Sequence, residues 1–415
     1  MIKRNLLTLI LTAIFSIVIT FLIYKKIVYP TIIPVEKDGL TYIFADWAAI
    51  ISANICDQKG INVYLENPCD IKNRKHVYGE ILLHLPLMES KIFYQFYQFY
   101  IPIILNVIFL LIIISFFNQT KTYKNYSLAL FIISLPVILV IERANLDIFI
   151  LILMYLISKY KNLFLNHFII IFSTLLKFYP ICFGAIFLFQ RNIKKIFLNL
   201  LILILFLILF MIHQYENLIA ILNNSLQFSG TGVYQFSIMS LIESIPNIQV
   251  IINNYNINWL IYFFIIFLLI SPLIFFGKKI FQDSEKETYL LNIFDLNNFE
   301  NRLYICSTFV IIFCYFAVQN YNYREIFLLG LVPWILKNES VNKNFLDIFF
   351  YIILFKFLIS TILTYLIMSK VNVNFNYFTN LTKHIIDFYV VSILSIILFL
   401  NLKNLFKKHF LLKKN

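Results

Sequence analysis

Charged side chains are scarce in this sequence. Asp, Glu, Lys and Arg together make up 13% of the 415 residues, whereas hydrophobic residues make up 61%. Ordinary soluble domains contain about 25% charged and about 45–50% apolar residues. The shortage of charge therefore excludes an ordinary soluble protein and predicts that lipid surrounds most of the chain.

Acidic residues are fewer than basic ones, with 21 Asp and Glu against 34 Lys and Arg, which gives a formal net charge of +13. The basic residues are dispersed over short loops, which argues against a nucleic-acid partner. Residues 213–259 lack Lys and Arg altogether, whereas alternate loops and the C-terminal tail carry them. The positive-inside rule therefore predicts that both termini are cytoplasmic and that 213–259 lies outside.

Recognisable cofactor motifs are absent as well. The sequence contains no Walker loop, no dinucleotide fingerprint, no metal-ligand spacing and no internal repeat. A small-residue cleavage site is also missing after the first apolar run, residues 5–23, which is followed by Lys25 and Lys26. We therefore predict no cofactor and no metal, and we interpret the first run as an uncleaved anchor.

Long apolar runs are what the sequence does contain. A helix needs roughly 20 apolar residues to cross about 30 Å of hydrocarbon. The runs 5–23, 101–117 and 196–212 meet this length, and shorter runs that end at polar clusters occupy 127–141, 146–158 and 163–176. We predict an all-α polytopic membrane protein with about twelve transmembrane helices, in which residues 1–415 form a single transmembrane domain.

Four segments lie between or beyond these runs: a first outer loop at 25–91, a second at 213–259, a cytoplasmic loop at 277–302 and a basic cytoplasmic tail at 403–415. The first outer loop carries two predicted interfacial elements. Asp46–Gln58 reads as an amphipathic helix that ends at Gly60, with Trp47 and other apolar residues resting on the membrane surface, and Glu80–Met88 is apolar enough to lie there too.

Cys56 and Cys69 also belong to this first outer loop. An oxidising compartment would permit a disulfide between them, but their spacing does not fix it.

Polar residues collect at one end of the apolar runs. With the predicted topology, the outer side holds Asp46 and the group Glu142, Arg143, Asn145, Asp147, Lys177, Tyr179, Tyr323 and Arg324. An ionisable group at membrane depth costs about 2.5–3.5 kcal/mol, so such groups pair or line a wet cavity. One interpretation is local pairing, of Arg143 with Asp147 and of Arg324 with Glu325. In the other, the cations Arg143, Lys177 and Arg324 bind a phosphate at the headgroup level.

Asp46 has no basic neighbour in the sequence Phe-Ala-Asp-Trp. It could cap the helix that follows, or it could act as a general base that takes a proton from an attacking alcohol. In the second case the basic cluster would stabilise a phosphate leaving group. His76, Tyr78 and Glu142 are further candidates, whereas Lys356, inside the run from Phe345 to Met368, receives no role.

These residues resemble those of a known family, the polyprenol-phosphate-dependent glycosyltransferases of family eighty-seven, which have the C-type membrane glycosyltransferase fold. The similarity lies in Asp46 before an alanine-containing helix, in the turns Glu142–Asp147 and Leu176–Pro180, and in the pair Tyr323 and Arg324. The chain departs from the family pattern at Gly79 and Glu80, where the family often has two prolines, and at Ala144, where it commonly has glycine.

The resemblance implies an inverting transfer of a hexose, often mannose, from a polyprenyl monophosphate to a lipid-linked or glycan acceptor at the outer face of a bacterial plasma membrane. Asp46 would be the general base, and Arg143, Lys177 and Arg324 would hold the donor phosphate. The implied partners are membrane lipids, the polyprenyl-phosphate sugar and a glycan or glycolipid acceptor of the cell envelope. The alternatives are a multi-span transporter or flippase of lipid-linked glycans, and a glycan polymerase or ligase. A transporter would place its polar residues near the membrane midplane.

Overall fold

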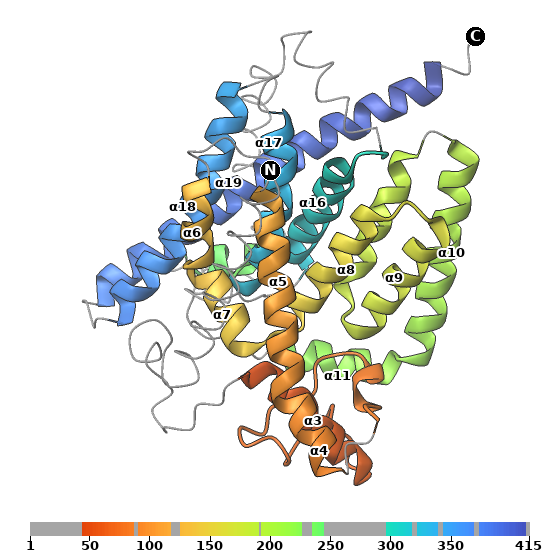
Figure 1. Ribbon diagram of the computed structural model, residues 1–415, viewed down its shortest axis with the longest axis vertical. Helices are drawn as coiled ribbons and strands as arrows, with labels where there is room; N and C mark the ends of the chain where they lie inside the picture. The colour runs from red at the N-terminus through yellow and green to blue at the C-terminus, as the bar shows by residue number, and fades with distance from the viewer. Residues whose placement is uncertain are drawn as a thin grey trace, which may run out of the picture. The chain divides into compact units, whose positions relative to one another are not determined.

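The computed structural model describes residues 44–86, 90–117, 125–190, 192–225, 235–244, 296–317, 322–338, 343–368 and 373–411. Every regular element in these ranges is a helix, which confirms the predicted all-α class (Figure 1). The apolar run 5–23, residues 226–234 and 245–259 of the second predicted outer loop, and most of the loop 277–302 lie outside the described residues.

Several helices are long and apolar enough to cross a membrane. In the described ranges there are five of them, namely Ile92–Phe117, Ile193–His213, Phe299–Ala317, Phe345–Leu363 and Asn380–Lys403. The first and second contain the predicted runs 101–117 and 196–212. The protein is therefore a membrane-embedded, all-helical one.

The chain folds into two compact units. Unit 1 comprises Met1–Gly184 and Leu200–Ser229, and unit 2 comprises Ala185–Asn199 and Gly230–Asn415. Two elements contain residues of both units, the 3₁₀ segment η3 (Tyr179–Phe189) and helix α10 (Ile193–His213). No feature of the sequence marked this division.

Unit 1 is a set of helices joined by short turns. Its elements are α3 (Ala45–Gln58), η1 (Glu80–Leu83), α4 (Lys91–Gln95), η2 (Phe96–Tyr100), α5 (Ile101–Phe117), α6 (Asn125–Ile132), α7 (Leu135–Arg143), α8 (Asp147–Lys159), α9 (Leu163–Leu176) and α11 (Tyr215–Ser225). Helix α5 packs against α8, and α8 packs against α9. The predicted run 127–141 is divided between α6 and α7, because Pro136 in the first turn of α7 has no N–H to continue the preceding helix.

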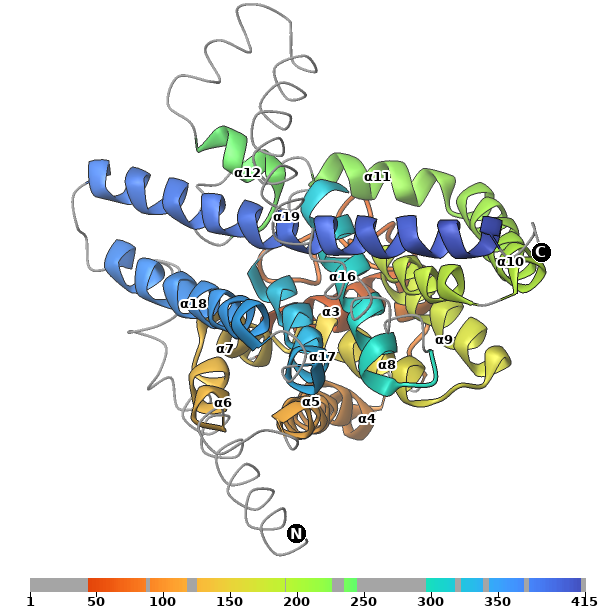
Figure 2. The same ribbon diagram turned by 90° about the horizontal axis from the view of Figure 1, so that it is seen from above.

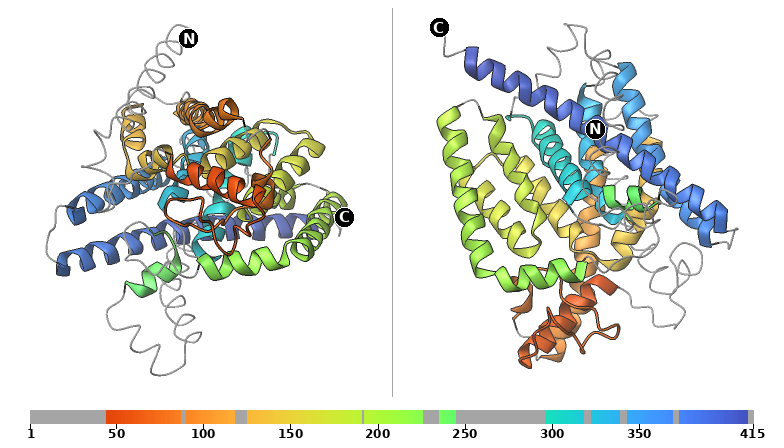
Figure 3. Two further views of the ribbon diagram at one scale, coloured as in Figure 1. Left: turned by 90° about the horizontal axis from the view of Figure 1, so that it is seen from below. Right: turned by 180° about the vertical axis from the view of Figure 1, so that it is seen from behind.

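Helix α3 forms over the predicted residues, but protein covers several of its apolar side chains. It ends at Gln58, two residues before Gly60, whose φ of 77° a residue with a side chain rarely adopts. Trp47, Ile50 and Ile51, predicted to face the membrane, are instead buried inside unit 1. The reason is that α3 packs against α7, η1 and η2, and Trp47 Nε1 donates a hydrogen bond of 2.8 Å to the carbonyl of Tyr97. Figure 3 (left) shows α3 with the loop that follows it.

A disulfide joins Cys56, in the last turn of α3, to Cys69 in that loop. The two residues are 13 positions apart and their Cα atoms are separated by 5.7 Å. Closing a loop of roughly 15 residues stabilises the folded state by about 3 kcal/mol in the chain-entropy account. The sequence left this pairing open, because the distance between the two cysteines depends on how the loop folds.

Unit 2 contains α12 (Ile238–Glu243), α16 (Phe299–Ala317), η5 (Asn322–Leu331), α17 (Val332–Asn338), α18 (Lys343–Met368) and α19 (Val373–Leu411). Helices α18 and α19 lie side by side (Figure 2), and both α16 and α12 pack against α19. The 3₁₀ segment η5 packs against α16. Helix α19 continues to Leu411, so most of the predicted basic tail, 403–415, extends this helix.

Candidate functional site

Asp46 lies in the first turn of α3, one residue after the helix begins. The residue that caps the helix is Phe44, and no side chain bonds to the free N–H groups of the first turn. The N-cap interpretation of Asp46 is therefore wrong. Its carboxylate is instead bound from a different part of unit 1. Asn145 Nδ2 donates to Oδ2 at 2.6 Å, and Arg143 Nη1 donates to Oδ1 at 3.3 Å.

The backbone brings these two segments together. The N–H of Phe44, which has a left-handed φ of 59°, donates a 3.0 Å hydrogen bond to the carbonyl of Glu142 at the end of α7. Ala144 then reverses the chain with a φ of 43° and places Asn145 beside α3. The left-handed conformation of Ala144 is one that glycine adopts without strain and that residues with a side chain rarely adopt.

Asn145 has one orientation that satisfies its neighbours. Its Oδ1 accepts from the N–H of Asp147 at 2.9 Å and from Lys177 Nζ at 3.3 Å. The amide nitrogen then points at Asp46, to which only a donor can bond. Asp46 thus accepts a hydrogen bond at each of its two oxygens, one from Asn145 and one from Arg143.

Lys177 and Asp147 form a buried ion pair behind Asn145. Nζ of Lys177 contacts Asp147 Oδ1, and the hydroxyl of Tyr179 donates to the same oxygen at 2.6 Å. The Lys177 ammonium also lies 5.3 Å from the ring centre of Tyr78 and 5.6 Å from that of Tyr179. Only 7% of the Lys177 side chain is exposed. Lys177 is thus placed to orient Asn145, which in turn binds Asp46.

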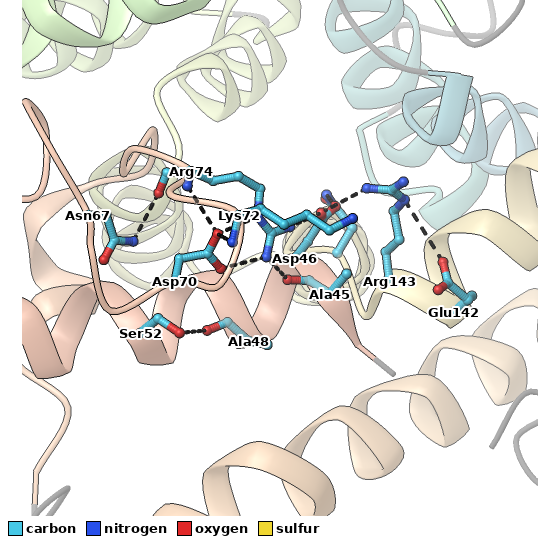
Figure 4. Close-up of polar contacts among 11 residues, drawn as sticks. Ala45, Asp46, Ala48, Ser52, Asn67, Asp70, Lys72, Arg74, Glu142 and Arg143 are labelled. Atoms are coloured by element: carbon cyan, nitrogen blue, oxygen red, sulfur yellow. Dashed lines mark hydrogen bonds and ion pairs between the residues drawn. The ribbon is translucent and has the colours of Figure 1, made fainter. Parts of the chain in front are cut away.

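Arg143 is the more accessible cation. Its side chain is 34% exposed, against 13% for that of Asp46. The neighbouring Glu142 carboxylate lies 3.9 Å from Arg143 Nε and is itself buried (Figure 4). Two ion pairs of unit 1 therefore join residues far apart in the sequence, Arg143 with Asp46 and Lys177 with Asp147.

Sequence reasoning missed Arg74. Its guanidinium lies on the other side of Asp46 from Arg143, with Nη1 3.7 Å from Asp46 Oδ1 (Figure 4). The same guanidinium binds Asp70 through two nitrogens, at 3.0 and 2.8 Å. The only sequence signal was the pairing of an acid and an arginine four residues apart, in a loop that has no helical pattern.

Gly79 provides the contact between the first loop and the segment that carries Lys177. Its N–H donates a 3.0 Å hydrogen bond to the carbonyl of Leu176. A Cβ atom at this position would lie 1.6 Å from the carbonyl oxygen of Leu175. A proline would lack the N–H, so this loop differs in structure from one that has two prolines here.

Gly79→Ala should therefore disturb the site. The new methyl group meets backbone atoms at the end of α9, and such overpacking costs about 1–3 kcal/mol. The matched control is Gly60→Ala, where a Cβ meets no atom within 4 Å and only the positive φ is strained. Thermal unfolding of both purified variants measures the difference. Equal stability of the two would contradict the close approach at Gly79.

His76 is buried between two tyrosines. Its ring makes edge contacts with Tyr64 and Tyr78, with centroid distances of 5.2 and 5.7 Å. Nε2 lies 3.4 Å from the carbonyl oxygen of Gly79. Burial lowers the pKa of His76 to about 4, because a charged imidazole would lose its hydration there. At neutral pH this histidine is uncharged and packs the loop that holds Tyr78.

A pH dependence of stability follows from this shift. Below the ordinary His pKa of about 6.5 the unfolded chain binds a proton that folded His76 does not. The free energy of unfolding should therefore fall as the pH drops from 6.5 to about 4, by about 3 kcal/mol at most. Thermal unfolding of wild type and His76→Gln across this range isolates the effect. The variant should show the shallower slope, and parallel curves would contradict a neutral buried His76.

Arg324 and Tyr323 belong to η5 in unit 2. Arg324 Nη1 contacts Cys314 Sγ of α16 at 3.8 Å, and Tyr323 is buried. The neighbouring Glu325 is paired with Lys356 Nζ at 2.8 Å. The ion pair of Glu325 thus joins η5 to α18, the helix that carries Lys356.

Unit 2 contains a buried group of charges that the sequence analysis did not predict. Lys356 Nζ contacts Asp387 Oδ1 at 2.5 Å as well as Glu325, and Lys383 Nζ contacts Asp387 Oδ2 at 2.8 Å. The carbonyl of Gln235 accepts from Lys383 at 2.6 Å. None of the four charged side chains is exposed. We call Glu325, Lys356, Lys383 and Asp387 the charge quartet.

Comparisons of the chain with protein-family models, curated proteins and solved structures found no match.

Proposed function

We propose that this protein is a membrane glycosyltransferase that transfers a hexose, such as mannose, from a polyprenyl monophosphate to a lipid-linked or glycan acceptor. One observation carries the proposal. The carboxylate of Asp46 is partly exposed and is held by Asn145 and Arg143, which fix its orientation. An oriented carboxylate next to an accessible guanidinium suits a reaction that removes a proton and releases a phosphate.

In the proposed reaction Asp46 takes the proton of the acceptor hydroxyl. The acceptor oxygen forms a bond to the anomeric carbon, and the bond from that carbon to the phosphate oxygen breaks. The polyprenyl phosphate leaves with the electron pair. Attack opposite to the leaving group inverts the anomeric centre.

Arg143 is the proposed ligand of the donor phosphate in unit 1. Its guanidinium is the more exposed partner of Asp46, and arginine binds phosphate through two parallel hydrogen bonds. A bound phosphate would compete with Asp46 for this cation. A carboxylate that loses a neighbouring cation accepts a proton more readily, so donor binding would prepare Asp46 for its step.

Lys177 and Arg324 are the other two cations predicted to bind the phosphate. Lys177 is engaged by Asp147 and Asn145, which supports a positioning role for it rather than direct contact with the phosphate. Arg324 lies in η5 of unit 2, and its role as a phosphate ligand stays a prediction from the sequence. In this proposal the cations are surrounded by other predicted site residues. Glu142 lies beside Arg143, and Lys177 is surrounded by Asp147, Tyr78 and Tyr179.

A membrane-bound donor fits the location of Asp46 within unit 1. Trp47 next to Asp46 bonds to Tyr97, in an aromatic segment at the start of the apolar helix Ile92–Phe117. In that segment Phe93, Phe96 and Tyr100 are 40%, 40% and 60% exposed. Exposed aromatic residues at the end of a span are typical of the headgroup level. We propose that this level is the outer face of a plasma membrane with both termini in the cytoplasm, following the charge of the loops.

A transporter or flippase of lipid-linked glycans is the second candidate, and the charge quartet favours it. Lys356 lies in one candidate span, and Lys383 and Asp387 lie in another, all fully buried. Charged groups within spans often mark ion or substrate pathways. The quartet contains two acids and two lysines in mutual contact, however, and this charge balance is also that of a structural network.

The test uses the purified full chain in liposomes. A radiolabelled mannosyl polyprenyl phosphate is added with candidate glycolipid acceptors, and products are separated by mass. Covalent transfer, with release of polyprenyl phosphate, is the expected result. Movement of labelled glycan across the bilayer with no covalent product would overturn the proposal in favour of the transporter.

A further inference from the structure

Asp46 has two guanidinium neighbours, and they are held in different ways. The side chain of Arg143 is 34% exposed and that of Arg74 is 28% exposed, and Arg143 Nε also lies 3.9 Å from the Glu142 carboxylate. Arg74 is bound by Asp70 through two hydrogen bonds, from Nε to Oδ2 and from Nη2 to Oδ1, in the parallel geometry that arginine and carboxylate prefer. Arg74 is thus held in one orientation by Asp70, and Arg143 is the slightly more exposed of the two cations.

Asp70 is well suited to hold Arg74. It is 2% exposed, and its Oδ2 also accepts the backbone N–H groups of Lys72 and Arg74 at 3.1 and 3.0 Å. Burial acts to raise the pKa of Asp70, but the hydrogen bonds and charge of Arg74 bring it below its ordinary value. Asp70 therefore remains ionised and keeps the guanidinium in one orientation.

The loop around this pair is itself fixed. Asn67 Nδ2 donates to the carbonyl of Arg74 at 2.9 Å, and the disulfide from Cys56 to Cys69 ends one residue before Asp70. The loop that carries Arg74 is therefore tied to the end of α3, the helix whose first turn contains Asp46.

Arg74 reaches that first turn at two points. Its Nη2 donates a 2.9 Å hydrogen bond to the carbonyl of Ala45, the residue before Asp46. Its Nη1 lies 3.7 Å from Asp46 Oδ1 (Figure 4). One guanidinium thus contacts both the backbone that carries Asp46 and the carboxylate itself.

We propose that Arg74 is a positioning residue for Asp46, and that the Asp70–Arg74 pair keeps a cation beside this carboxylate and holds its orientation when the phosphate of the donor engages Arg143. The inference rests on the proposed function of Asp46 as general base. It adds to that function a loop residue, Arg74, that acts on the general base Asp46 and not on the donor or the acceptor.

The test compares Arg74→Gln, Arg74→Lys and wild type in the transfer assay as a function of pH. Loss of the cation should move the acid limb of the kcat profile to higher pH by about one unit, since an adjacent opposite charge favours the ionised carboxylate. Arg74→Lys keeps the positive charge but loses the planar guanidinium that makes two parallel hydrogen bonds. The kcat should therefore fall about tenfold, with little movement of the acid limb. The KM for the donor should change less than twofold in both variants.

Lys75→Gln is the matched control, because it removes the same charge from the next position. Its side chain is directed to Asn224, at 3.1 Å, and not to Asp46. Its profile should coincide with that of wild type. An acid limb in Arg74→Gln equal to that of Lys75→Gln would overturn the proposal, because a purely structural role lowers the amount of active protein without moving the limb.

Two further measurements keep the outcomes distinct. If Arg74→Gln is not monodisperse, Arg74→Lys decides, and wild-type kcat in that variant overturns the proposal. If wild type transfers no sugar, the proposed function fails while the contact can still be tested by unfolding Asp46→Asn, Arg74→Gln and the double variant. Additive losses of stability would then refute the coupling of Arg74 to Asp46.

Discussion

Asp46→Asn should lower the rate of hexose transfer about 10²–10⁴-fold, the range that a general base contributes. The substitution preserves the size of the side chain but removes the negative charge that accepts the proton. It should not raise the KM for the donor, because Arg143 loses an intramolecular competitor for the phosphate. Initial rates of the purified variant at saturating donor, together with its melting temperature, measure both effects.

The control for this experiment lies in the same helix. Asp57→Asn makes the same chemical change near the other end of α3, away from Asn145 and Arg143, and should transfer at the wild-type rate. A folded Asp46→Asn protein as fast as Asp57→Asn would show that Asp46 is not the base. Attention would then move to Glu142, a buried carboxylate beside Arg143.

The second large effect is expected in unit 2, on stability. Lys356→Met should destabilise the protein by about 3–5 kcal/mol, because it leaves Glu325 and Asp387 buried with too few cations. Adding Glu325→Gln restores the charge balance and should recover part of the loss. Denaturant or thermal unfolding in detergent provides the measurement.

Lys337→Met serves as the comparison. Lys337 also contacts an acid, Glu300 at 2.8 Å, but its side chain is 36% exposed. An ion pair of this kind contributes about 0–1 kcal/mol. Similar stability of the Lys356 and Lys337 variants would mean that water reaches the quartet and that its charges are not trapped.

The helices were predictable because their signals are local. Apolar runs fixed the positions of α5 and α10, and the segment from Asp46 to Gly60 defined α3 nearly to the residue. The polar turn from Glu142 to Asp147 was also recognisable, since charges embedded in apolar sequence are costly and therefore conspicuous. The all-helical, membrane-embedded class follows from the same signals.

The partners of the charged residues could not be predicted in this way. Sequence distance suggested Arg143 with Asp147, yet the contacts join Arg143 to Asp46 and Lys177 to Asp147. These pairs form because backbone hydrogen bonds, such as that from Phe44 to Glu142, bring distant turns together. The quartet escaped prediction for the same reason, although Lys383 and Asp387 are one helical turn apart and could have been noticed.

The disulfide has a consequence for how the protein is made. Thiols are oxidised outside the cytosol, in the periplasm or its equivalents. The loop between Cys56 and Cys69 would therefore have to be translocated before the bond forms, and Asp70 and Arg74 follow directly in the chain. Assembly of the Asp46 end of unit 1 is then completed after membrane insertion. Protein produced in a reducing cell-free mixture would contain the helices but lack the disulfide between Cys56 and Cys69.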